Sequence, residues 1–95
     1  MSTPKVKAIP EVFLPVKYGV EDIGALQAVM EGRAEPHQQQ RAMTWIVNNA
    51  CGTYDMDYRP DPRDHAFISG RRFVGLQIVK MLKLNAAAFK DKDKA

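Results

Sequence analysis

The chain has 95 residues, a single cysteine and a net charge of +3. At this length we expect one domain with a thin core, and a lone cysteine excludes an internal disulfide. No apolar run is long enough to cross a bilayer, and the N-terminal segment lacks the apolar centre of a signal peptide. The small basic excess permits contact with nucleic acid or an acidic protein surface but requires neither. The composition therefore predicts a soluble protein of a reducing compartment.

Residues 1–17 contain three prolines, at positions 4, 10 and 15, among several apolar side chains. Proline interrupts helices and pushes the preceding residue toward extended geometry. We predict an extended N-terminal arm. The arm either packs in a groove of its own domain, packs on a neighbouring subunit, or is a free tail. The sequence leaves these alternatives open.

A first helix is predicted over residues 20–31. Glu21 and Asp22 place negative charge in its first turn, and Gly32 stands where a left-handed C-terminal cap belongs. The apolar residues recur at helical spacing and predict one buried face, formed by Ile23, Leu26, Val29 and Met30.

A second helix is predicted over residues 36–50, beginning at Pro36 and stopping before Gly52. Its apolar stripe comprises Ala42, Met43, Ile46, Val47 and Ala50, with Trp45 beside it. The polar run 38–40 is either solvated helix surface or a contact surface for a partner, since glutamine can read adenine edges in DNA. Cys51 is expected to act as a small buried apolar residue.

The connection that follows carries Asp55 and Asp57, a spacing found in some cation-binding loops. The central glycine and terminal glutamate of an EF-hand are missing from the register, so we expect no metal there. Tyr54 and Tyr58 are instead predicted to cover the edge of the core.

A long third helix is predicted to begin at Asp61 or Pro62 and to run to Leu84. Asp61 can cap free backbone N–H groups, and Pro62 suits the first turn. A core stripe is predicted at Phe67, Val74, Ile78 and Met81. Gly70 and Gly75 leave flat places where another backbone could approach.

The second half of this helix is apolar on most of its circumference, which is more than two short helices can cover. Burial against another copy of the chain is the expected outcome. The predicted oligomer interface consists of Phe73, Leu76, Val79, Leu82 and Leu84.

His65 and Ser69 share a face of the third helix, and Asp61 lies one turn earlier. Nucleophilic catalysis needs a base, a group that orients the base, and oxyanion donors in a pocket, which one exposed helix face does not supply. No zinc-ligand spacing and no glycine-rich phosphate loop occur. We therefore expect a protein that is not an enzyme and has no cofactor or metal.

Four arginines, Arg59, Arg63, Arg71 and Arg72, cluster around the first half of the third helix. They form either an ion-paired helix surface or an anchor for DNA phosphates or acidic side chains. A helix-turn-helix motif is disfavoured, because the connection at residues 52–60 is far longer than the turn of that motif.

The segment from Pro60 to Leu84 resembles a small, largely uncharacterised family of tailed-bacteriophage proteins first noted in a Bordetella podovirus. The matching residues are Phe67, Gly70, Arg71, Arg72, Val74, Gly75 and Leu76, and an upstream apolar helix ending near Cys51–Gly52 is also similar. Members of that family tend to be encoded among head and DNA-packaging genes. The resemblance covers the second half of the chain and implies a role in virion assembly, in the host cytoplasm or in the virion.

Together these features predict an all-α protein: an extended arm (1–17), a three-helix domain with a long C-terminal helix (18–85) and a charged flexible tail (86–95). The expected function is non-enzymatic, in DNA packaging or head assembly, with a role like that of a small terminase subunit or a virion accessory protein. Expected partners are further copies of the chain, double-stranded DNA, and a phage protein such as the large terminase or the portal, with no membrane. The alternative is a small phage inhibitor or adaptor that docks on a host enzyme.

Overall fold

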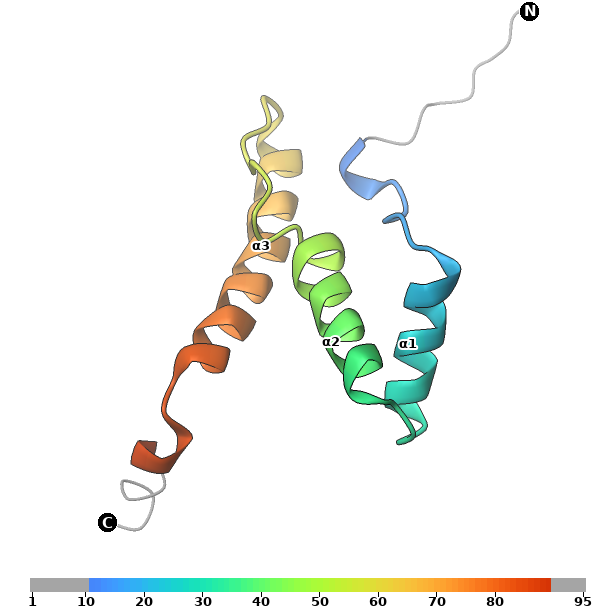
Figure 1. Cartoon of the computed structure of the whole chain (residues 1–95). Coiled ribbons are helices and arrows are strands. Elements are labelled where there is room, and N and C mark those ends of the chain that lie inside the picture. Colours follow the sequence, from blue (N-terminus) through green and yellow to red (C-terminus); the bar gives the residue numbers. More distant parts are fainter. Residues whose placement is uncertain (1–10, 90–95) are drawn as a thin grey trace, which may run out of the picture.

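A computed structural model describes residues 11–89, and over this range the protein is helical and contains no strand (Figure 1). The elements in chain order are the 3-10 helix η1 (Glu11–Phe13), α1 (Val20–Met30), α2 (Pro36–Thr44), the π-helix η2 (Trp45–Ala50) and α3 (Pro62–Lys83). A further helical turn follows at residues 86–89. The all-α prediction with a long C-terminal helix is confirmed. The first ten residues of the predicted arm and residues 90–95 of the predicted tail lie outside the described residues.

Helices α1 and α2 form an antiparallel hairpin. Gly32 adopts φ 74°, and the backbone N–H groups of Gly32 and Arg33 donate to the carbonyls of Val29 and Ala28. This left-handed glycine closes α1 as the sequence predicted. Across the hairpin, Arg41 Nε donates to Asp22 Oδ1 at 2.8 Å.

The predicted buried face of α1 is wrong. Ala25 and Ala28 are the buried residues, whereas Val29 is 45% exposed and Met30 is 87% exposed. Small side chains let the two helices approach closely, so the larger apolar residues of α1 remain at the edges of the contact.

The second helix extends to Ala50, but its last six residues form a π-helix. Cys51 N donates to the carbonyl of Ile46, five residues earlier, at 2.9 Å. Ala42 and Val47 of the predicted stripe are buried, and Cys51 is buried as expected, while Met43 is 40% exposed.

The N-terminal segment from residue 11 packs on its own domain. Val12 is buried, and the ring of Phe13 contacts that of Phe67 on α3 edge-on with centroids 4.7 Å apart. Farther along, Trp45 Nε1 donates to the carbonyl of Lys17 at 2.9 Å. Residues 11–17 of the predicted arm therefore pack on their own domain, which was one of the alternatives left open by the sequence.

Helix α3 begins as predicted. Asp61 Oδ1 accepts hydrogen bonds from the backbone N–H groups of Arg63 at 2.8 Å and Asp64 at 3.3 Å, with Pro62 in the first turn. The principal contacts of α3 are with η2 and η1. The second half of α3 diverges from α2, so α3 and the α1–α2 hairpin form a V in Figure 1.

The divergence makes the molecule elongated. Its principal extents are 66 × 32 × 18 Å and its radius of gyration is 18.0 Å, whereas a compact domain of this length has a radius of about 12 Å. No helix within residues 11–89 is long and apolar enough to span a membrane.

The predicted core stripe of α3 is also wrong. Phe67, Val74 and Met81 are 41%, 51% and 69% exposed, and Ile78 is half-buried. The buried positions are Ile68 and Gly75. The face of α3 that packs inward is therefore the neighbouring row of side chains, which contains Ile68 and Gly75 instead of Phe67 and Val74.

Candidate functional site

The contact between α3 and the rest of the chain is centred on Thr53, which is fully buried. Its hydroxyl donates to the carbonyl of Val47 at 2.6 Å, and its own carbonyl accepts from Arg72 Nε at 2.9 Å. Gly75 faces it: a Cβ at position 75 would lie 1.7 Å from Thr53 Oγ1. We call Cys51, Gly52, Thr53 and Gly75 the Thr53 junction.

Of the two glycines expected to admit another backbone, only Gly75 has a close neighbour. Its neighbours are Thr53 and Cys51 of the same chain, while a Cβ at Gly70 would meet nothing within 4 Å. Gly52 also needs to be glycine, because its φ is 59° and Arg71 Nη2 lies 2.8 Å from its Cβ position.

A polar cluster beside the junction joins the interhelical connection to α3. Ser69 Oγ donates to Asp57 Oδ2 at 3.1 Å, and His65 Nδ1 lies 3.1 Å from the carbonyl of Asp57. Ser69 Oγ and His65 Nε2 are 3.5 Å apart, and Arg72 Nη1 is 3.9 Å from Asp57 Oδ2. The His65 imidazole therefore contacts the backbone of Asp57 rather than Asp61, the acidic residue one turn earlier on α3.

This cluster has the residue types of a catalytic triad but not its arrangement. The Asp57 carboxylate accepts a hydrogen bond from the Ser69 hydroxyl rather than orienting His65, and the imidazole nitrogen is at the outer limit of hydrogen-bond distance from Ser69. These contacts of Asp57 hold the connection 52–61 against the first half of α3. Among residues 11–89, no group of three or more His, Cys, Asp and Glu side chains is placed to hold a metal ion.

The four arginines do not form one surface. Arg72 is bonded to Thr53, and Arg59 donates through Nη1 to the carbonyls of Met56 at 3.1 Å and Tyr58 at 2.8 Å. Arg71 is half-buried over Gly52, and only Arg63 is exposed. Three of the four side chains therefore have positions inside the fold, which the sequence pattern did not reveal.

The predicted oligomer interface on α3 is mostly exposed. Phe73 is 60% exposed, and Leu76, Leu82 and Leu84 are 38%, 63% and 45% exposed. Val79 is half-buried and lines a cavity with Val47 and Tyr54. We call the four exposed residues Phe73, Leu76, Leu82 and Leu84, together with Val74 and Met81, the distal face of α3.

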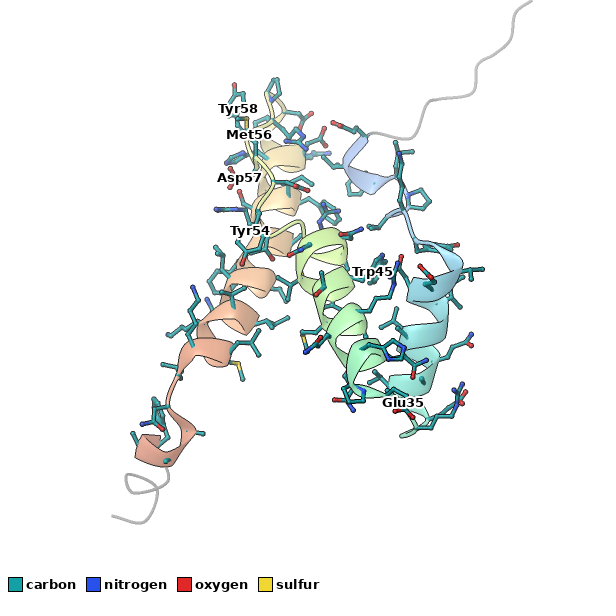
Figure 2. The ribbon with its side chains drawn as sticks, viewed as in Figure 1. Glu35, Trp45, Tyr54, Met56, Asp57 and Tyr58 are labelled. Carbon is teal, nitrogen blue, oxygen red and sulfur yellow. The ribbon has the colours of Figure 1, made fainter. Side chains whose placement is uncertain are left out.

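A second exposed apolar surface was missed from the sequence. Tyr54 and Tyr58 were expected to cover the core edge, but they are 68% and 64% exposed, and Met56 between them is 78% exposed. Figure 2 shows them along the connection that runs beside the first half of α3.

Comparisons with family models, with curated proteins and with solved structures find no match to this chain.

Proposed function

We propose that the protein is a non-enzymatic assembly module that self-associates through the distal face of α3. The single observation that carries the proposal is the exposure of five large apolar side chains in the second half of α3, and of Leu84 directly after it, on a segment that diverges from the rest of the domain. Exposed apolar surface of this kind marks interaction sites in soluble proteins. A second copy offers the same surface, so a symmetric contact is available without another partner.

The spacing of α3 side chains supports helix pairing. Phe67, Val74, Ile78 and Met81 recur at steps of seven, four and three residues, which place them along one side of the helix. The seam predicted as an internal core is exposed or half-exposed, which makes it available to a facing helix.

The resemblance of residues 60–84 to a family of phage proteins suggests the process in which the protein acts. In our proposal the assembled protein acts in head assembly or DNA packaging, and Arg63, which is exposed near the start of α3, contributes to binding DNA or an acidic phage partner. Arg63→Gln is then expected to weaken DNA binding and to reduce the salt dependence by about one phosphate contact.

The test of self-association is the solution mass of the full chain and two variants by light scattering on a sizing column. Phe73→Glu places a charge in the distal face, and we expect it to weaken assembly at least about tenfold, since the buried phenyl ring is worth roughly 1.5–3 kcal/mol. Met30→Glu is the matched control, because Met30 is 87% exposed at the end of α1. A wild type that is monomeric at all concentrations, or equal dissociation of both variants, contradicts the proposal.

A second candidate function is docking on a host protein as an adaptor or inhibitor. It is favoured by the exposed Tyr54, Met56 and Tyr58, because tyrosine and methionine are enriched at protein interfaces. A monomeric wild type whose binding to a host protein is lost in Tyr54→Ala/Tyr58→Ala supports this candidate.

A further inference from the structure

A recess separate from the distal face lies between the N-terminal segment, the end of η2, the connection and α3. It has a volume of about 360 Å³, and its polar lining consists of Glu11, Lys17, Asn49, Asp55, Arg59 and Arg71. This is within the size range of small-ligand sites in proteins. Because four separate parts of the chain meet here, the lining residues are brought together only by folding.

The Arg71 side chain on this recess lacks a partner for its charge. Its Nε atom is buried and has no hydrogen-bond partner, and no ion pair of Arg71 occurs within the described part of the chain. A guanidinium group stays charged in proteins. Burying the Nε–H donor without an acceptor costs free energy, and no carboxylate within residues 11–89 forms an ion pair with the guanidinium group.

Arg59 is held in place on the same recess. Its Nη1 donates to two backbone carbonyls, whereas its buried Nε makes no hydrogen bond and lies 3.5 Å from Glu11 Oε1. The Glu11 side chain is 77% exposed, so this ion pair contributes little and can open. Arg59 is therefore held in position on the recess, with its positive charge only weakly paired.

The charge of the recess favours an anion. Three cationic side chains (Lys17, Arg59, Arg71) face two carboxylates (Glu11, Asp55), which leaves a net charge of 3 − 2 = +1. We propose that the recess binds a small oxyanion of the phosphate class, with Arg59 and Arg71 as the donors and Lys17 as a further positive charge. Guanidinium groups match the oxygens of phosphate and make charge-assisted hydrogen bonds to them.

The carboxylate of Asp55 competes with an added anion for the guanidinium group of Arg71. Its Oδ2 lies 3.3 Å from the Cβ position at Gly52, where Arg71 Nη2 lies at 2.8 Å, so carboxylate and guanidinium are neighbours without forming an ion pair. If Asp55 opposes the incoming anion, Asp55→Asn tightens binding. If Asp55 instead serves as the partner of Arg71 in solution, Asp55→Asn frees the guanidinium group, so it again tightens binding, and it also lowers stability.

The probe is inorganic phosphate, added at constant ionic strength against chloride to the ¹⁵N-labelled full chain. We expect the Nε–H resonances of Arg59 and Arg71 to shift saturably, with Arg33, which is 58% exposed and lies outside the recess, as the internal control. Arg71→Lys keeps the charge but removes the fork of donors, and should weaken binding about tenfold, whereas Arg33→Lys should not change it. A short DNA duplex in a parallel titration shows whether a phosphate within nucleic acid reaches the same donors.

Two results overturn the proposal. One is a linear, non-saturating shift shared by all arginines, which indicates ionic atmosphere alone. The other is an affinity unchanged in both Arg71→Lys and Asp55→Asn; Asp55→Asn provides a test even if Arg71→Lys fails to fold. Self-association through the distal face is measured independently by solution mass, so either proposal can fail without the other.

Discussion

Replacing Gly75 by alanine should destabilise the protein, although the same change inside a helix is normally favourable. Alanine has a helix propensity better than glycine by about 1 kcal/mol. At position 75, however, the new Cβ would lie 1.7 Å from Thr53 Oγ1, 2.9 Å from Cys51 Cβ and 3.0 Å from Thr53 Cβ. Neither neighbour is the end of a long side chain, so α3 or the connection must move.

The magnitude follows from what gives way. Overpacking a tight contact costs about 1–3 kcal/mol, and turning Thr53 away breaks its hydroxyl bond to the carbonyl of Val47, at a further cost of roughly 1–2 kcal/mol. After the helix-propensity gain is subtracted, we expect a net loss of about 1–4 kcal/mol. Small domains have total stabilities of only about 5–15 kcal/mol, so the effect is large.

Gly70→Ala is the matched control, because a Cβ at position 70 of the same helix meets nothing within 4 Å. It should stabilise the protein by about 0.5–1 kcal/mol. Urea unfolding can be followed by the fluorescence of Trp45, which is the single tryptophan of the chain, and by circular dichroism. If Gly75→Ala is as stable as the wild type or more so, the close contact at the Thr53 junction does not exist.

Three further predictions concern the ends and the pairing of the helices. Asp61→Ala removes the side-chain acceptor for two backbone N–H groups and should cost about 1 kcal/mol in urea unfolding, while Asp61→Asn, which keeps an acceptor, should cost clearly less. Trp45→Phe removes the hydrogen bond to the carbonyl of Lys17 and should raise the rate of trypsin cleavage after Lys17 about fivefold, as expected for loss of roughly 1 kcal/mol; an unchanged rate would show that this bond does not hold the segment. The backbone N–H of Gly19, together with Arg41, holds the pKa of Asp22 below its usual value of 3.8, so this carboxylate contributes stability above pH 3.8 that is lost as the pH falls further; Asp22→Asn should therefore flatten the acid limb of the stability curve, and an identical limb in both proteins would refute the assignment.

The helix boundaries were readable from sequence because local chemistry sets them. Asp61 and Pro62 begin α3, and Gly32 ends α1, through hydrogen bonds within a few residues of each position. Such signals need no knowledge of tertiary contacts.

The inward faces were less readable because the burial pattern does not follow side-chain hydrophobicity. On α3 the row that packs inward contains Ile68, Arg71, Arg72 and Gly75. Hydropathy alone assigns the two arginines to the surface and does not mark the glycine as a contact. The Arg72 bond to the carbonyl of Thr53 and the close approach of Gly75 depend on a connection that has no periodic pattern. A hydrophobic stripe on a helix can equally face its own core or a partner, and here the larger apolar residues remain exposed.

The arginine cluster illustrates the same limit. Closeness in sequence grouped four arginines as one basic surface. In the structure, however, Arg72 donates a hydrogen bond to the carbonyl of Thr53, and Arg71 packs over the backbone of Gly52. A signal was present in the sequence, since Arg71 lies one turn from Phe67 and from Val74, which were expected to be buried. This spacing does not separate a structural arginine from an exposed one.

The most direct test of the central claim is the solution mass of the wild-type chain across a range of protein concentrations, measured by analytical ultracentrifugation. Association through the distal face of α3 predicts a mass that is a multiple of the chain mass of 10.7 kDa and that falls toward one chain on dilution, with Phe73→Glu dissociating at higher concentration than the wild type. A mass of one chain at every concentration would contradict self-association and leave the distal face without its proposed partner.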